Sequence, residues 1–189
     1  MYQKYHTEAL VLGSRETGES DRTITLFTRD FGLVRARASA IRSEKSKMRY
    51  ALQNYTYAHV SLVRGKNGWR AAGATAILTA QGSPQVLATF ARIAELAMRF
   101  VGVDENNEYI FQTLMEAHEA LITTPDAYPT IEIMCVARIL YSLGYISAEA
   151  LRSTLFSHTA YQAVHLTEAE ELKPELLRSI NNALAETHL

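Results

Sequence analysis

Between Thr7 and about Leu78, apolar and polar positions alternate in five short runs separated by polar turns. A period of two is typical of strands with one buried face. The expected strands are EALVLGSRE, TITLFT, GLVRARASA, NYTYAHVSLV and GWRAAGATAIL. Asn67-Gly68, between the last two runs, has the chemistry of a tight hairpin turn. Five strands without a long helix predict a small barrel of the OB type, with an SH3-like barrel as the alternative.

In the second half, apolar residues recur every three or four positions, which predicts amphipathic helices. Ser83 and Pro84 suit the N-cap and first position of a helix that extends to about residue 101. Thr167 and Glu170 have the spacing of a capping box, and Pro174 begins the last helix. Further helices are expected at 108–122, 130–143, 148–156 and 160–164.

The charge of the chain reverses where the pattern changes. Residues 1–80 hold 13 Lys and Arg against 6 Asp and Glu, a balance of +7, whereas residues 81–189 hold 6 against 14, a balance of -8. We therefore expect a two-domain α+β protein, with an all-β OB-fold nucleic-acid-binding domain over 1–80 and an all-α helical domain over 81–189. A basic domain of this kind faces a polyanion, unless the two halves neutralise each other in an interaction scaffold.

The strongest local feature is the basic stretch RARASAIRSEKSKMR, residues 35–49. Period two directs the first two arginines to the outer face of a strand. Lysine and arginine neutralise phosphates and release counterions, so such a stretch binds nucleic acid with little regard to sequence. A solvated loop is the alternative. The predicted phosphate-binding residues are Arg35, Arg37, Arg42, Lys45, Lys47 and Arg49.

The hairpin at the end of the first domain extends this prediction. It adds three cations, Arg64, Lys66 and Arg70. Aromatic rings nearby offer flat surfaces on which unpaired bases stack, although each ring is alternatively a core or rim residue of the barrel. The predicted stacking residues are Tyr55, Tyr57 and Trp69.

Signatures of enzyme chemistry are absent from the sequence. There is no GxxxxGK[ST], GxGxxG, GxSxG, HExxH or CxxC motif, and the histidines lack ligand spacing. We expect no catalytic residue, cofactor or metal, and turn roles for Glu16, Glu19 and Asp21. Cys135, the single cysteine, is expected to be buried in a helix. Without an apolar signal core or a long apolar run, the chain is expected in the cytoplasm, away from membranes.

The segments EALVL, GESDRTITLFTRDFGLV, SEKSKMR, LQNY and LVRGKNGW follow one another over residues 7–70 in an order that resembles the bacterial RecO family of recombination mediators. The resemblance implies an OB-fold domain followed by a helical domain, and a non-enzymatic role in DNA repair by homologous recombination. It implies binding of single- and double-stranded DNA, annealing of strands coated with single-strand-binding protein, and work with RecR to load RecA, an indirect partner. It places the protein in the bacterial cytoplasm, at the nucleoid.

Two departures from the family pattern change what we expect. Many members carry four cysteines after a Leu-Gly-aromatic signature, where this chain has ISAEALRSTLF, so a short form without the zinc module is expected. The second departure is the loop ASAIRSEKS, where the family more often has a glycine and paired basic residues. Docking of a partner's acidic tail would need a hydrophobic groove with a cation; Arg92, Arg99 and Arg138 are the candidates, and no motif selects among them. An OB module that binds RNA is the alternative function.

Overall fold

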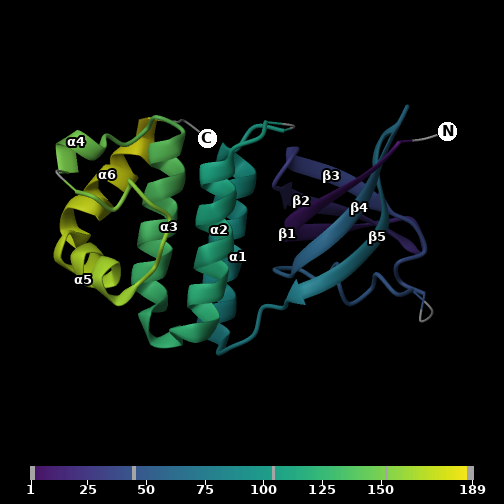
Figure 1. Ribbon diagram of the computed structural model, residues 1–189, viewed down its shortest axis with the longest axis horizontal. Helices are drawn as coiled ribbons and strands as arrows, with labels where there is room; N and C mark the ends of the chain where they lie inside the picture. Colours follow the sequence, from purple (N-terminus) through teal and green to yellow (C-terminus); the bar gives the residue numbers. More distant parts are fainter. Residues whose placement is uncertain (1–2, 44–45, 104, 152, 187–189) are drawn as a thin grey trace. The chain divides into compact units, whose positions relative to one another are not determined.

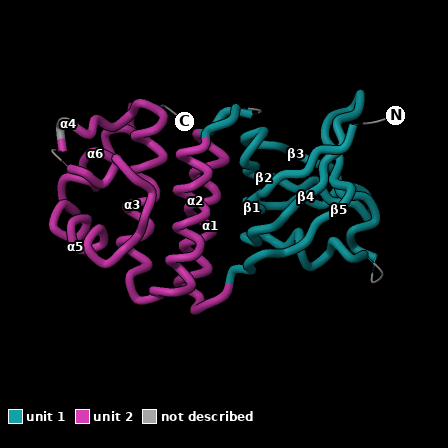
Figure 2. The backbone as a smooth tube through the Cα atoms, in the orientation of Figure 1, with its two compact units in different colours: residues 1–80, 101–107 teal, residues 81–100, 108–189 magenta. Residues whose placement is uncertain are grey.

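The computed structural model describes residues 3–43, 46–103, 105–151 and 153–186 (Figure 1). The chain divides into two compact units, which Figure 2 shows in different colours. The first unit comprises residues 1–80 together with 101–107, and the second comprises 81–100 and 108–189. The polypeptide therefore leaves the first unit, forms one helix of the second, and returns briefly to the first.

The first unit is a closed five-stranded barrel (Figure 1). Its strands follow the order β1-β2-β3-β5-β4, and β4 pairs back with β1. All pairings are antiparallel except β3 with β5. This arrangement confirms the predicted OB fold over the SH3-like alternative. The strands are β1 (Lys4–Thr17), β2 (Asp21–Thr28), β3 (Gly32–Ala38), β4 (Tyr57–Gly65) and β5 (Gly68–Leu78).

Alternation along β3 builds one wall of the barrel core. Ala36 and Ala38 are fully buried, whereas Arg35 and Arg37 are exposed on the outer face, as predicted. The alternation was expected to continue through Ala40, and that expectation is wrong. Ala40 is exposed with a φ of 51°, because the strand has ended and the backbone turns.

The bounds of two other strands differ from the prediction. β1 begins at Lys4, earlier than expected, and the Tyr5 ring packs edge-on against Phe31. β4 begins at Tyr57, so Tyr55 lies outside the strand with a φ of 64°. The backbone N–H of Tyr55 donates to a β1 carbonyl at 2.7 Å. The strand expected over NYTYAHVSLV therefore begins later than predicted, and Tyr55 and Tyr57 do not share one strand face.

Residues 101–107 complete the first unit. Val103 forms a parallel bridge with Leu33 at the start of β3. Beside it, Gly32 has a φ of 62°, and a Cβ atom there would lie 1.9 Å from the backbone oxygen of Glu105. Only a residue without a side chain allows this approach. The helical pattern that follows residue 81 gave no sign of this return.

The second unit is all helical, and α3 packs against α1, α2, α5 and α6. Helices were expected at 148–156 and 160–164, and both ranges are wrong. No helix in the described part of the chain has the length and apolar character needed to cross a membrane. The elements are α1 (Pro84–Phe100), α2 (Glu108–Thr123), η1 (Pro125–Ala127), α3 (Tyr128–Ser142), α4 (Ala148–Leu151), α5 (Ala163–Glu171) and α6 (Lys173–Glu186).

A side-chain cap is present at the start of α1 but not at α3 or α5. The Ser83 hydroxyl oxygen accepts a hydrogen bond of 3.3 Å from the Val86 N–H, so the predicted N-cap of α1 is confirmed. The predicted capping box is wrong, since Thr167 lies within α5. Its supposed partner Glu170 instead accepts a hydrogen bond from the Thr130 hydroxyl on α3. That contact ties α5 to α3.

Arg138 is fully buried in the helical unit. Its guanidinium donates to the carbonyls of Leu155, Thr159 and Ala160 at 2.8, 2.7 and 3.0 Å, and lies 4.7 Å from the Tyr161 ring centroid. It therefore holds the segment 155–160, and its guanidinium is not free to dock a partner. Cys135, on the same helix, is buried as predicted, and burial raises its pKa to about 12.

Candidate nucleic-acid interface

The seam that closes the barrel brings two predicted binding residues together. Strands β3 and β5 pair over Ala36 with Trp69 and Arg37 with Arg70. Residues in register on neighbouring strands point to the same face of a sheet. Arg37 and Arg70 are both exposed, so the seam carries two cations side by side on its outer face.

A groove of about 560 Å³ runs beside this seam. Its lining includes Arg37 and Arg70 from the strands and Lys66 from the β4–β5 turn. Gly68 in that turn has a φ of 95°, as the predicted hairpin requires. Three predicted cations from distant parts of the chain thus share one groove. Such a group can contact phosphate oxygens of a nucleic-acid backbone without reading bases.

Asp21 restrains one of these cations. Arg37 donates from Nε and Nη2 to Oδ2 of Asp21 at 2.8 and 2.6 Å, while Oδ1 accepts from the Ala40 N–H at 2.8 Å. The Ala40 N–H first, and then Arg37, hold the pKa of the Asp21 carboxyl below its ordinary value. Asp21 therefore has a turn role, as predicted, and also offsets the Arg37 charge.

Trp69 belongs mainly to the barrel core. Its side chain is 8% exposed, and its ring centroid lies 5.6 Å from Tyr5 and 5.1 Å from Phe31. The Arg64 guanidinium lies over the ring, 5.1 Å from its centroid. Little of the indole face is left for a base, and the core role that the sequence allowed is the one observed.

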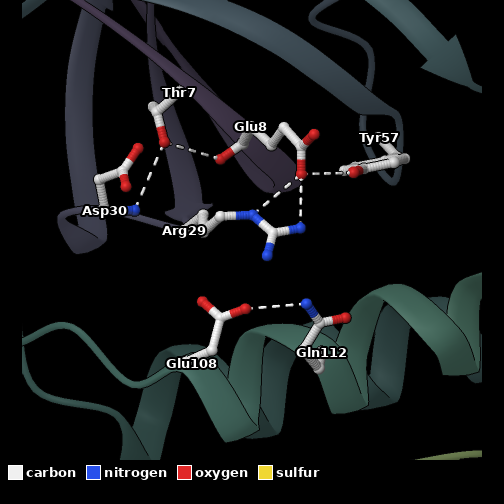
Figure 3. Close-up of polar contacts among 7 residues, drawn as sticks. All are labelled: Thr7, Glu8, Arg29, Asp30, Tyr57, Glu108 and Gln112. Carbon is white, nitrogen blue, oxygen red and sulfur yellow. Dashed lines mark hydrogen bonds and ion pairs between the residues drawn. The ribbon is translucent and has the colours of Figure 1, made fainter.

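Tyr57 is engaged in a polar cluster on the barrel (Figure 3). Its hydroxyl donates to Oε2 of Glu8 at 2.8 Å, and the same oxygen accepts from Nε and Nη2 of Arg29 at 3.0 and 2.6 Å. Burial first, and then the Glu8 carboxylate, raise the pKa of Tyr57 to about 12. This half-buried tyrosine joins β1, β4 and the end of β2.

The basic stretch 35–49 is not one continuous surface. Arg35 stands on β3, whereas Arg42 and Arg49 line a separate pocket of about 340 Å³. Lys47 lines a third hollow, of about 1060 Å³. Lys45 lies outside the described residues. The stretch divides because its chain turns back repeatedly: the N–H groups of Ser43, Ser46 and Arg49 each donate to the carbonyl three residues earlier.

The third hollow is a weaker candidate for binding phosphates. Besides Lys47, its lining includes Glu8 and Asp30, and Glu8 is already paired with Arg29. The neighbouring His6 Nδ1 lies 2.9 Å from the Ser61 hydroxyl oxygen. The charges of the hollow are mixed in sign, so it lacks the cationic excess of the seam groove.

Sequence reasoning missed two residues that the structure brings forward. Tyr50 is 69% exposed, and the Arg49 guanidinium lies 6.0 Å from its ring centroid. Arg22 lines the pocket that Arg42 and Arg49 share. The position of Tyr50 directly after the basic stretch was the available signal. In the described ranges, no three His, Cys, Asp or Glu residues are grouped to hold a metal ion.

Comparison with known proteins shows similarity to one family. The profile described as "Recombination protein O N terminal" matches residues 1–71. A DNA repair protein RecO from Dehalococcoides mccartyi is 30% identical over 180 residues, which cover 94% of this chain and 60% of that protein. The chain is therefore similar to RecO proteins over nearly its whole length. A second RecO, from Desulfitobacterium hafniense, is 49% identical over 63 residues, 33% of this chain and 23% of that protein.

Similarity to RecO proteins is strongest over the barrel. The family profile covers all of β1 to β4 and the start of β5, including the seam groove. The chain spans about 60% of the length of the Dehalococcoides RecO protein. With a single cysteine, these 189 residues encode no four-cysteine module.

Proposed function

We propose that this chain binds DNA through its barrel unit and acts in recombinational DNA repair. The seam groove carries the proposal, because Arg37, Lys66 and Arg70 line it together. Cations grouped in this way neutralise phosphates whatever the base sequence. The similarity to RecO proteins, which are named as DNA repair proteins, supports the same function.

The activity proposed in detail is that of a non-enzymatic recombination mediator. Two phosphate chains held on a cationic surface repel each other less, so complementary strands anneal there without a covalent step. Recombinase loading onto strands coated with single-strand-binding protein follows as the second activity. The proposed partners are single- and double-stranded DNA, RecR and single-strand-binding protein, with RecA affected indirectly. The acidic half is the proposed docking domain for proteins.

The primary test is binding of labelled DNA against salt concentration. With roughly four to six phosphate contacts, the logarithm of affinity for single strands should fall with that of salt at a slope of about -3 to -4. The double variant Lys66→Gln, Arg70→Gln should make the slope shallower by about 1.4, whereas the exposed α6 variant Arg178→Gln should leave it unchanged. A slope near zero for the unaltered protein would contradict DNA binding by these cations.

A second experiment tests the finer activity and its alternatives. Complementary labelled strands, bare or coated with single-strand-binding protein, should anneal faster with the protein present. Reversing the charges at Arg35, Arg37 and Lys47 should abolish the acceleration. If annealing survives that reversal, the interaction-scaffold alternative gains. If an RNA oligomer displaces DNA at lower concentration than a DNA oligomer does, the RNA-binding alternative gains.

A further inference from the structure

A pocket near the β1–β2 turn has an excess of positive charge. Arg22 from β2 lines it with Arg42 and Arg49 from the loop that follows β3, against the single carboxylate of Glu16. Arginine in such a group suits an anion with several acceptor oxygens, because each planar guanidinium presents a fork of donors. The pocket measures about 340 Å³ and lies apart from the seam groove.

Glu16 pairs only weakly with the arginines of this pocket. It faces Arg22 directly across the β1–β2 pairing, with the closest oxygen and nitrogen 3.8 Å apart. Its other oxygen lies 3.5 Å from Arg42. Both distances exceed those of good charge-assisted hydrogen bonds, and the Glu16 side chain is 61% exposed. An exposed pair of this kind contributes little, so a better acceptor can displace the carboxylate.

One hydrogen-bond donor of the Arg22 guanidinium has no acceptor in the described residues. This donor is the Nε, which is buried. A buried donor without an acceptor is rare in folded proteins, since it has lost water without gaining a replacement. An incoming phosphate oxygen can supply what Glu16 does not.

An exposed aromatic ring lies beside Arg49, one of the residues that line the pocket. Tyr50 follows Arg49 in the chain, and the guanidinium of Arg49 lies 6.0 Å from the Tyr50 ring centroid. Tyr50 is the most exposed large hydrophobic residue in the described part of the chain. Rings beside a cationic groove are stacking platforms for unpaired bases. Paired bases in a duplex are already stacked and do not use one.

We infer that Arg22, Arg42 and Arg49 form a seat for a phosphate of single-stranded DNA, that Tyr50 stacks the adjoining unpaired base, and that Glu16 occupies the seat in the free protein. This inference rests on the proposed DNA binding and adds a strand preference to it. The seam groove holds backbone of either form, whereas the Tyr50 platform selects single strands. Displacement of Glu16 accompanies their binding.

The test compares a fluorescent oligothymidylate with a duplex of equal length, binding to the full chain. Tyr50→Ala should weaken single-strand binding about fivefold to a hundredfold and duplex binding less than twofold. The control Tyr145→Ala removes an exposed ring from the helical unit and should change neither. Equal effects of Tyr50→Ala on both DNA forms, or no effect on either, would overturn the stacking role.

Variants that remove charges test the proposed phosphate seat. The double variant Arg22→Gln, Arg49→Gln should make the single-strand salt slope shallower by about 0.7. Glu16→Gln should tighten binding about two- to fivefold, more than the matched change Glu19→Gln in the β1–β2 turn. An unchanged slope, or equal effects of the two glutamate variants, would overturn the seat. If the unaltered protein binds neither DNA, the proposed function itself fails, an outcome distinct from these.

Discussion

The Tyr57 hydroxyl donates a 2.8 Å hydrogen bond to the Glu8 carboxylate across the pairing of β1 with β4. The bond favours the neutral phenol and the charged carboxylate together. It raises the Tyr57 pKa and is the largest cause that lowers the pKa of Glu8. This contact between β1 and β4 therefore depends on pH twice: it is weakened in acid when Glu8 is protonated, and lost in alkali when Tyr57 is deprotonated.

Tyr57→Phe should destabilise the barrel by about 1 kcal/mol near neutral pH, since one hydrogen bond is lost. Because the folded-state pKa of Tyr57 is raised to about 12, its contribution is complete below its ordinary pKa of about 10 and lost as pH rises through 12. The stability difference between the two proteins should shrink over that interval. Urea unfolding followed by Trp69 fluorescence measures it. A difference constant from pH 8 to 12 would contradict the coupling.

Asp21→Asn should tighten DNA binding. Without the carboxylate charge the Arg37 guanidinium is freed for phosphate, and the gain should be about two- to fivefold in affinity at low salt. The amide oxygen can still accept from the Ala40 N–H, so the turn should persist. Asp30→Asn makes the same charge change on the same barrel, away from Arg37. If both variants tighten binding equally, release of Arg37 is not the cause.

The barrel was predictable because its signal is local. Alternation along β3 and the Asn67-Gly68 turn are each set by a few adjacent residues, and both are observed. The prediction failed at Ala40 and Tyr55. Each lies outside its predicted strand with a positive φ, which alanine and tyrosine rarely adopt and do not indicate in a sequence. The weak helices after residue 147 failed for a related reason. Their bounds follow tertiary contacts, such as those of Arg138, more than propensity.

The candidate site was predictable in composition but not in arrangement. The sequence supplied a run of cations, and period two gave the direction of Arg35 and Arg37. Pairing of Arg37 with Arg70 depends on the parallel seam, which joins residues far apart in the chain. The burial of Trp69 and the exposure of Tyr50 depend on how the barrel closes. No local pattern distinguishes those two rings.

Gly32→Ala should destabilise the barrel by at least about 2 kcal/mol, because a Cβ meets the Glu105 backbone and the φ is positive. Gly18→Ala is the matched control. Its φ of 70° is similar, but no atom lies within 4 Å of the added carbon, so only about 1 kcal/mol is expected. Urea unfolding followed by Trp69 fluorescence distinguishes the two. Equal losses would show that the contact with residue 105 is unimportant.

Arg138→Met should destabilise the helical unit by about 3 kcal/mol, since three carbonyls lose their donor in a buried site. The exposed variant Arg178→Met should stay within about 0.5 kcal/mol of the unaltered protein. Thermal unfolding followed by far-ultraviolet circular dichroism reports the helices. Equal stability of the two variants would mean that the Arg138 hydrogen bonds contribute nothing net.

The return of residues 101–107 to the barrel has a consequence for the order in which the protein is made. When residue 80 has left the ribosome, all five strands are available, but Val103, which bridges Leu33, has not been synthesised. The nascent barrel must wait for the whole of α1 before its last backbone bridge can form. The ribosome therefore makes part of the second unit before the first is complete. The barrel can begin to fold first, but it cannot form its last bridge until residue 103 has been made.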